Sequence, residues 1–477
     1  KKKIQKVILE KKEKKTVTQK KDKIDQTIST KKIVDNFIYP LEKPLGFKVR
    51  SSKQVIKSNI LNTSDYIAAK EIINLIKKKK WDSALSLTKN VKDKEFHNLI
   101  NWMYLKENNN KASFNDYVNF ISKNPDYPRI NRLRYLAEQK IILKNTSPYQ
   151  IINWFKDQEP LSGTGKVKLG EAYLDVGENA LGVGLIKSGW ITAKLSSSDL
   201  KFYRKKFKNF ISSSDHLKRA DYLAWNNKYW DLKRMLRYLP KNERLLYNAR
   251  FILMTHSYGV DKAIADVPYN LKNDVGLKYD RLKWRNRRNR LESSLEILEK
   301  APKSESELVR ADLWWKQRKE LVRDLIYKKD YERAYAVSSN HYLSEGPEFA
   351  EAEWLSGWLA LSFLNKPKRA IEHFEKFYEN VGYPISRARG AFWLGLSHEK
   401  SGNSDKSKRY YEAGSKFTNT YYGQLSFNKI SYGQDFKLVK SLRHSKEYEK
   451  EFNKNKLIRH VKLLKELDKT ELSKDII

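Results

Sequence analysis

The chain alternates apolar positions at helical spacing with short polar turns. Ile67, Ile72 and Ile76 recur at steps of four or five residues, which places them on one face of a helix. Residues 77–80 are all lysine, and the apolar pattern restarts after them at Trp81. The pattern therefore predicts a helix, a basic turn and a second helix, beginning at about residue 65.

The same unit recurs between residues 321 and 417. Its turns fall at residues 328–330, 365–367 and 401–404. Gly357 and Gly395 mark equivalent points in two copies and are 38 residues apart. Helix pairs repeated at about this length are typical of α-solenoids, so we expect an all-α fold of stacked helix pairs.

The residue types expected between the paired helices are typical of tetratricopeptide-like repeats. A glycine on the first helix lets the second helix approach, and an aromatic ring on the second helix fills the groove. Stacked pairs form a continuous core and leave a concave surface that suits a long ligand. Aromatic residues make up 12% of the chain. We interpret most of them as solenoid core and the remainder as rings that stack on sugars or bases.

The amino-acid composition excludes several classes of fold and of active site. The 19 glycines and 12 prolines are few for 477 residues, which disfavours folds with many tight turns. Cysteine is absent, which excludes disulfides, thiolate metal sites and cysteine nucleophiles. The 8 histidines include no pair at metal-ligand spacing, and the Gly-x-Ser-x-Gly motif of hydrolases does not occur. We predict no metal, no cofactor and no catalytic residue in this chain.

The charge balance is strongly positive. The 96 Lys and Arg residues against 57 Asp and Glu residues give a net charge of +39. Because the lysines are spread along the whole chain, we interpret them mainly as solvated surface. Attraction of nucleic acid, an anionic membrane face or a carboxylate-rich polymer is the alternative. We expect a largely disordered basic arm at residues 1–62, and no apolar run is long enough for a signal peptide or a membrane span.

Residues 162–166, Ser-Gly-Thr-Gly-Lys, look like half of a phosphate-binding loop. That motif needs a glycine where Pro160 stands and a serine or threonine where Val167 stands. We therefore reject a nucleotide site and expect this segment to open a helix at residues 167–176.

The densest arginine cluster is headed by a tryptophan. It consists of Trp284, Arg285, Arg287, Arg288 and Arg290. Guanidinium groups bind carboxylates or phosphates through two parallel hydrogen bonds, and the nearby ring can stack on a ligand. The alternative is a solvated helix start or turn ahead of the next apolar run. The cluster is the best local candidate for polyanion contact.

Three segments carry a resemblance to a known family. They are residues 353–361 (Glu-Trp-Leu-Ser-Gly-Trp-Leu-Ala-Leu), 384–395 (Pro-Ile-Ser-Arg-Ala-Arg-Gly-Ala-Phe-Trp-Leu-Gly) and 420–425 (Thr-Tyr-Tyr-Gly-Gln-Leu). Their order and spacing resemble the superhelical domain of the soluble lytic transglycosylases that act on peptidoglycan, the murein of the bacterial cell wall, and the likeness extends over residues 65–435. The signature positions are Trp354, Gly357, Trp358, Arg387, Trp393, Gly395, Tyr421, Tyr422, Gly423 and Gln424.

The resemblance implies an architecture and a reaction. It implies an α-superhelix that forms a U or a ring at residues 63–431, followed by a helical linker region at residues 432–477. Members of the family are periplasmic, and a lysozyme-like catalytic domain closes their chain. One glutamic acid of that domain cleaves the bond between N-acetylmuramic acid and N-acetylglucosamine without water and leaves a 1,6-anhydro end. The implied partners are glycan strands and the C-terminal catalytic domain of the same full-length protein.

The family's catalytic motif, Glu-Ser followed by Gly-Leu-Met-Gln, is not found in the chain. The Glu-Ser pairs at residues 292–293 and 305–306 lack the second segment, and we interpret both as surface residues. We expect a fragment without the catalytic domain and without lyase activity of its own, its signal peptide removed or outside the fragment. The expected function is a non-catalytic scaffold that binds and guides glycan strands. The alternative is a non-enzymatic helical-repeat adaptor for a protein or a polyanion, and we do not expect nucleic acid as the partner.

Overall fold

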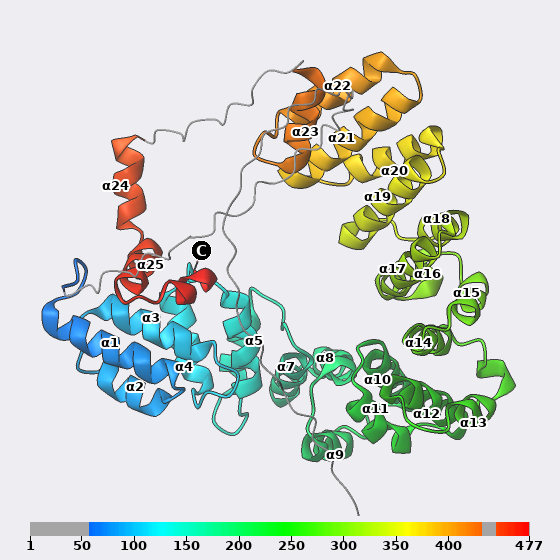
Figure 1. The fold of residues 1–477 in the computed structure, drawn as a ribbon. Helices are drawn as coiled ribbons and strands as arrows, with labels where there is room; N and C mark the ends of the chain where they lie inside the picture. The colour runs from blue at the N-terminus through cyan, green and yellow to red at the C-terminus, as the bar shows by residue number, and fades with distance from the viewer. Residues whose placement is uncertain (1–56, 432–444, 477) are drawn as a thin grey trace, which may run out of the picture. The chain divides into compact units, whose positions relative to one another are not determined.

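All the regular secondary structure in the part of the chain that the structure describes is helical. This computed structural model describes residues 57–431 and 445–476. Those residues form twenty-five α-helices and three short 3-10 helices, with no strand among them (Figure 1). The prediction of an all-α fold built from helix pairs is confirmed. The basic arm predicted at residues 1–62 lies almost entirely outside the described residues.

Short polar side chains fix the starts of the N-terminal helices. Asn62 accepts a hydrogen bond from the backbone N–H of Asp65 at 2.8 Å, and Ser113 forms a reciprocal capping box with Asp116. Such caps satisfy N–H groups that the first turn of a helix leaves without a partner. The helices of this part are α1 (Thr63–Lys77), α2 (Trp81–Thr88), α3 (Lys94–Leu105), α4 (Phe114–Lys123), α5 (Ile130–Lys140), α6 (Pro148–Phe155), α7 (Gly163–Asp175), α8 (Asn179–Thr192) and α9 (Ser197–Lys206).

The turns inside most helix pairs share one backbone form. The middle helices are α10 (Ser213–Trp225), α11 (Tyr229–Met235), η1 (Leu236–Tyr238), α12 (Lys241–Thr255), α13 (Val260–Ala265), η2 (Tyr269–Leu271), α14 (Val275–Asn286), α15 (Leu291–Glu299), α16 (Glu305–Leu308), α17 (Ala311–Tyr327) and α18 (Tyr331–Ser339). Between α17 and α18, Lys329 has a φ of 61°, and the N–H of Asp330 donates to the carbonyl of Leu325 at 2.8 Å. This is the Schellman arrangement, in which one left-handed residue closes a helix. It recurs with positive φ at Lys79, Gly177, Asn227, His256, Asn289 and Gly402.

In the C-terminal helix pairs, a glycine on one helix faces an aromatic ring on the other. The helices of this part are α19 (Gly346–Ser362), α20 (Pro367–Glu379), α21 (Pro384–Lys400), α22 (Ser404–Ser415), α23 (Tyr421–Ile430), α24 (Lys446–Lys454), α25 (Lys456–Glu466) and η3 (Thr470–Asp475). A Cβ atom added at Gly357 would lie 2.8 Å from the ring of Phe374, and one at Gly395 would lie 2.7 Å from the ring of Tyr411. Only glycine permits these approaches, so the predicted packing of glycine against a ring is confirmed in both pairs.

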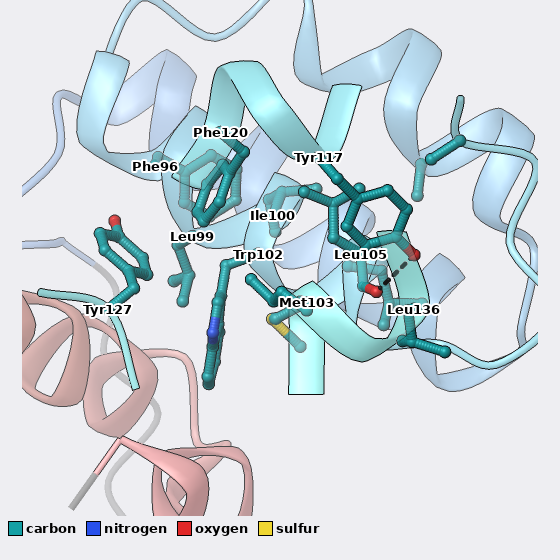
Figure 2. Packing of buried hydrophobic residues seen from close by; sticks show 14 of the residues in the cluster. Phe96, Leu99, Ile100, Trp102, Met103, Leu105, Tyr117, Phe120, Tyr127 and Leu136 are labelled. Atoms are coloured by element: carbon teal, nitrogen blue, oxygen red, sulfur yellow. Dashed lines mark hydrogen bonds between the residues drawn. The ribbon is translucent and has the colours of Figure 1, made fainter. Parts of the chain in front are cut away.

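The N-terminal core includes side chains from the C-terminal end of the described chain. Helices α1–α5 bury a cluster of aromatic and aliphatic residues, among them Phe96, Trp102 and Tyr117 (Figure 2). Leu463 and Leu464 on α25 belong to the same buried cluster and are fully covered. Burial of these two leucines stabilises the contact by about 1.5–3 kcal/mol each relative to exposure.

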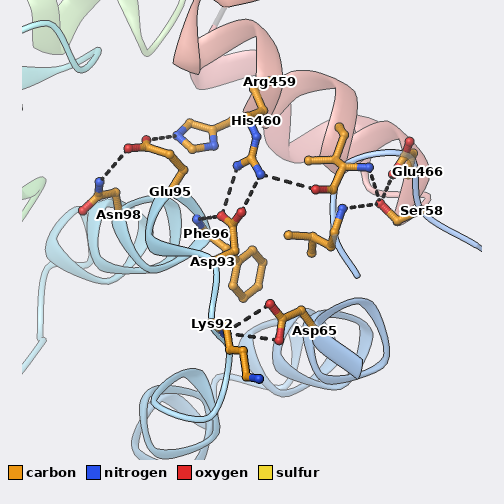
Figure 3. A network of polar contacts seen from close by, with 12 residues as sticks. Ser58, Asp65, Lys92, Asp93, Glu95, Phe96, Asn98, Arg459, His460 and Glu466 are labelled. Carbon is orange, nitrogen blue, oxygen red and sulfur yellow. Dashed lines mark hydrogen bonds and ion pairs between the residues drawn. The ribbon is translucent and has the colours of Figure 1, made fainter. Parts of the chain in front are cut away.

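Polar contacts also join α25 to the N-terminal part of the described chain (Figure 3). Arg459 on α25 donates two hydrogen bonds to the carboxylate of Asp93, at 3.1 and 2.5 Å. Glu466 accepts from the hydroxyl of Ser58 at 2.5 Å. Residues 445–476 are thus helical and in contact with the first helices of the chain, while their assignment as a linker region stays a prediction.

Candidate binding surfaces

The signature residues lie on the first helices of three successive units. Trp354, Gly357 and Trp358 are on α19, Arg387, Trp393 and Gly395 are on α21, and Tyr421, Tyr422, Gly423 and Gln424 are on α23. The structure brings only some of these side chains together. Their roles divide into ring packing, helix capping and exposed surface.

Five rings form one group, which we call the aromatic cluster: Trp354, Trp358, Phe374, Trp393 and Tyr422. Trp354 and Trp358 stack at 6.1 Å between ring centroids, and Trp354 meets Trp393 edge to face at 6.0 Å. Trp393 in turn stacks on Phe374 at 5.6 Å and lies 6.5 Å from Tyr422. Phe374 is fully buried, whereas the three tryptophans and Tyr422 are half-buried. The cluster therefore packs the helices together and also contributes to the surface of α19, α21 and α23.

Several signature residues have local structural roles. Arg387 donates to the carbonyl of Tyr378 at 2.8 Å and lies over its ring at 3.6 Å, which satisfies the end of α20. A Cβ atom at Gly423 would lie 2.0 Å from the carbonyl oxygen of Phe417, so the start of α23 requires glycine. Gln424 donates to the carbonyl of Thr418 at 3.1 Å. Tyr421, by contrast, is 68% exposed.

Arg389 lies within the second resembling segment but is not among the predicted site residues. Its guanidinium carbon lies 5.1 Å from the ring centroid of Trp354 and 5.8 Å from that of Tyr422. Cation–π contact of this kind favours the charged group over the ring faces. The spacing of aromatic residues along three helices was the one sequence signal that could have found it.

The structure brings only some residues of the predicted arginine cluster into contact with one another. Trp284 and Arg285 are in the last turn of α14, and the others occupy the turn before α15, so the interpretation as a turn is correct for these. Arg288 lies over the ring of Trp284 at 3.9 Å and Arg290 lies over it at 5.2 Å. Arg285 instead donates to the backbone carbonyl of Ser293 and is used within the chain.

Electrostatics in this turn favour an anion. Arg287, Arg288 and Arg290 are exposed. Arg287 donates to Nε2 of His256 at 2.6 Å, so that ring nitrogen accepts and the imidazole is neutral. Burial, followed by the charges of Arg287 and Arg288, lowers the pKa of His256. The turn thus concentrates positive charge in a small exposed area.

A buried carboxylate held by two histidines was missed by sequence reasoning. Glu353 on α19 is 3% exposed, and it accepts from Nε2 of His341 at 3.2 Å and from Nδ1 of His373 at 2.5 Å. Nδ1 of His341 accepts from the N–H of Leu343 at 3.0 Å, and Nε2 of His373 is hydrogen-bonded to the hydroxyl of Tyr335 at 3.0 Å. Burial raises the pKa of Glu353, but the two histidine hydrogen bonds outweigh it and bring the pKa to about 2. The three groups come from separate elements, so no sequence spacing reveals them.

The segment at residues 162–166 binds an internal carboxylate. Helix α7 begins at Gly163, so the predicted start at residue 167 was four residues too late, because Ser162 caps the helix by accepting from the N–H of Gly165 at 2.9 Å. Glu138 accepts from the N–H groups of Leu161 and Ser162 at 2.7 and 2.8 Å. A Cβ atom at Gly165 would lie 2.5 Å from this carboxylate. The backbone N–H groups of Leu161 and Ser162 are therefore already bonded to a carboxylate of the chain itself.

Three other properties of the described chain bear on chemistry. Glu292 and Glu305 are exposed, as expected. Within residues 57–431 and 445–476, no group of three or more His, Asp or Glu side chains is arranged to hold a metal ion. None of the helices in these ranges is both long enough and apolar enough to cross a membrane.

Comparison with known proteins gives a distant likeness. No family model and no curated protein matches the chain. Similar solved structures are the 70 kDa soluble lytic transglycosylase from Escherichia coli and the 70 kDa soluble lytic transglycosylase in complex with bulgecin A. Each has 10% sequence identity and a TM-score of 0.48, and each alignment covers 87% of this chain. The chain spans 65% of the length of these structures.

Proposed function

We propose that the chain is a non-catalytic helical-repeat scaffold that binds peptidoglycan glycan strands in the periplasm. The reaction would be supplied by a lytic transglycosylase domain of the same full-length protein, which the scaffold guides along the strand. This proposal rests on the ordered resemblance of the three segments and on the surface that their side chains form.

The observation that carries the proposal is the aromatic cluster. Half-buried rings from α19, α21 and α23 follow one another at separations of about 6 Å. Exposed Tyr383 and Tyr421, 82% and 68% accessible, stand at the starts of α21 and α23. These two tyrosines are 38 residues apart and hence equivalent in the repeat. Rings with one apolar face and one polar edge suit the faces and hydroxyl groups of sugar rings.

The test is cosedimentation of the purified chain with purified peptidoglycan sacculi at 150 mM salt. We expect the wild type to sediment with the sacculi and Tyr383→Ala/Tyr421→Ala to bind about tenfold more weakly, since each ring contributes about 0.5–1.5 kcal/mol. Tyr327→Ala is the matched control, because Tyr327 is 91% exposed and is the last residue of α17 rather than a residue at a helix start. A wild-type chain that stays in the supernatant would refute the proposal.

A second candidate function is supported by the turn at residues 287–290, which we call the arginine turn. Arg288 and Arg290 share the ring of Trp284, and no described residue forms an ion pair with either guanidinium. This arrangement supports an adaptor that binds a polyanion. Its test is salt-dependent binding, described in the Discussion.

A further inference from the structure

Arg389 is a permanent positive charge for which the described chain supplies no counter-ion. The side chain is half-buried and is flanked by the rings of Trp354 and Tyr422. Among residues 57–431 and 445–476, no side chain or carbonyl accepts a hydrogen bond from its guanidinium. A guanidinium does not lose its proton in proteins, so this charge persists at every pH at which the chain is folded.

The preceding repeat shows what the equivalent position does when it is paired. Glu351 and Arg389 are 38 residues apart, and each lies six residues before its repeat glycine, Gly357 or Gly395. Glu351 accepts from the indole N–H of Trp315 at 3.0 Å and from Lys319 at 2.8 Å, both on the preceding first helix. Arg389 meets only the ring of Trp354 on its own preceding first helix. At this equivalent position, the first of these repeats has an ion pair between Glu351 and Lys319. The next repeat has an arginine that contacts an aromatic ring and forms no ion pair within the described chain.

Three buried arginines of the described chain have structural partners. Arg219 donates to the carbonyl of Ala193 at 2.9 Å, and Arg318 donates to that of Val337 at 3.3 Å. Arg250 is paired with Asp280 at 2.7 Å. These contacts satisfy helix ends or balance charge, which is the usual reason for burying part of an arginine. Arg389 has neither kind of contact.

Two carboxylates on α19 and α21 are already engaged, and no carboxylate of the described residues forms an ion pair with Arg389. Glu353 is held by two histidines, and Glu399 pairs with Lys429 at 3.1 Å and accepts from Tyr411 at 2.6 Å. An anion for Arg389 is therefore best supplied by a ligand. The planar fork of a guanidinium matches a carboxylate in two parallel hydrogen bonds, and the adjacent rings suit the apolar part of the same ligand.

We propose that Arg389 binds a carboxylate of the ligand that lies across the aromatic cluster. The inference rests on the proposed function, because the glycan strand of peptidoglycan carries carboxylates in two places. One is the lactyl group of N-acetylmuramic acid once its peptide is removed, and the other is in the attached peptides. Arg389 is thus a ligand-binding residue that deepens the role of the cluster from sugar contact to recognition of an acidic sugar polymer.

The test measures binding of the full chain to two soluble preparations of glycan strands. One preparation keeps its peptides, and the other has had them removed by an amidase, so that only lactyl carboxylates remain. We expect Arg389→Gln to lower affinity by about tenfold or more, as expected when a charge-assisted bidentate contact is lost. A loss confined to the strands with peptides assigns the peptide carboxylate, and a loss on the stripped strands assigns the lactyl carboxylate.

Arg409→Gln is the control for charge. The substitution removes the same single charge at a residue that is exposed on α22. Arg389→Lys keeps the charge without the fork and should bind with intermediate affinity. The melting temperature of each variant separates lost binding from lost folding. Wild-type binding with unchanged affinity in folded Arg389→Gln would overturn this inference alone, whereas absence of wild-type binding to both preparations would overturn the proposed function with it.

Discussion

Gly395 on α21 and the ring of Tyr411 on α22 are in direct contact, and a Cβ atom at Gly395 would lie 2.7 Å from that ring. The distance is shorter than real Cβ contacts, so the glycine determines how closely the two helices pack. The same relationship holds for Gly357 and Phe374 one repeat earlier, at 2.8 Å. The repeat is therefore defined by this contact as much as by its length.

Gly395→Ala should destabilise the chain by about 1–3 kcal/mol, because the added methyl group overpacks the ring and displaces α22. Alanine is otherwise the better helix former, so propensity alone predicts the opposite sign. Denaturant unfolding monitored by circular dichroism measures the difference. Gly184→Ala on α8 is the matched control, since nothing lies within 4 Å of its Cβ position, and it should stabilise by about 0.5–1 kcal/mol. Equal effects of the two substitutions would contradict the packing argument.

The repeat could be predicted from sequence because its determinants are local. The turn at residues 328–330 and the glycines at 357 and 395 are visible as spacing, and the structure has helix pairs at these places. The start of α7 was misplaced because it depends on a cap by Ser162 and on the buried carboxylate of Glu138. Neither contact leaves a periodic apolar signal.

The binding surfaces were less accessible to sequence reasoning. The signature residues include Trp354 and Trp393, whose rings do meet, but also Arg387, which caps a helix. Arg389 stands two residues further along α21. It differs from Arg387 because the described residues of the neighbouring helices provide no hydrogen-bond acceptor and no counter-ion for it. Contacts such as that of Arg459 with Asp93 join residues 366 positions apart, for which a single sequence gives no spacing signal.

Glu353→Gln should destabilise the chain by about 3–5 kcal/mol, the usual cost of removing one partner from a buried charged network. The amide would place a donor against the N–H of His341 or His373, both of which now donate to the carboxylate. Thermal unfolding at pH 7 measures the loss. Glu351→Gln on the same helix is the control, because its side chain is 45% exposed and its pair with Lys319 is worth about 1 kcal/mol or less. A melting temperature no lower than that of the control would show that the histidines do not depend on the charge of Glu353.

Arg288→Gln/Arg290→Gln should weaken binding of a single-stranded oligonucleotide used as a model polyanion. If both guanidinium groups contact phosphates, the slope of log affinity against log salt should become shallower by about 1.4. Fluorescence anisotropy titrations at several salt concentrations between about 50 and 200 mM measure this slope. Lys408→Gln/Arg409→Gln removes the same charge from an exposed part of α22 and should leave the slope nearly unchanged. Equal losses in both double variants would indicate attraction by net charge rather than a site at the arginine turn.

The contact of α25 with the first helices should weaken in mild acid because of His460. This histidine is fully buried, accepts from or donates to the hydroxyl of Tyr127 at 2.8 Å, and faces Arg459, Lys456, Asp93 and Glu95. Burial, followed by the charge of Arg459, lowers its pKa from 6.5 to about 4. Between these values the unfolded state binds the proton and the folded state does not, so stability falls as the pH falls from about 6.5 to about 4.

The difference corresponds to about 3 kcal/mol, all of it present above pH 6.5. Hydrogen exchange of the α25 amides at pH 7 and pH 5, corrected for intrinsic rates, should show lower protection at pH 5 in the wild type. His460→Gln keeps a polar partner for Tyr127 without a titrating group, so its protection should change less between the two pH values. Because other histidines titrate equally in both proteins, the difference between wild type and variant isolates His460. The same pH dependence in His460→Gln as in the wild type would assign the acid sensitivity to another group.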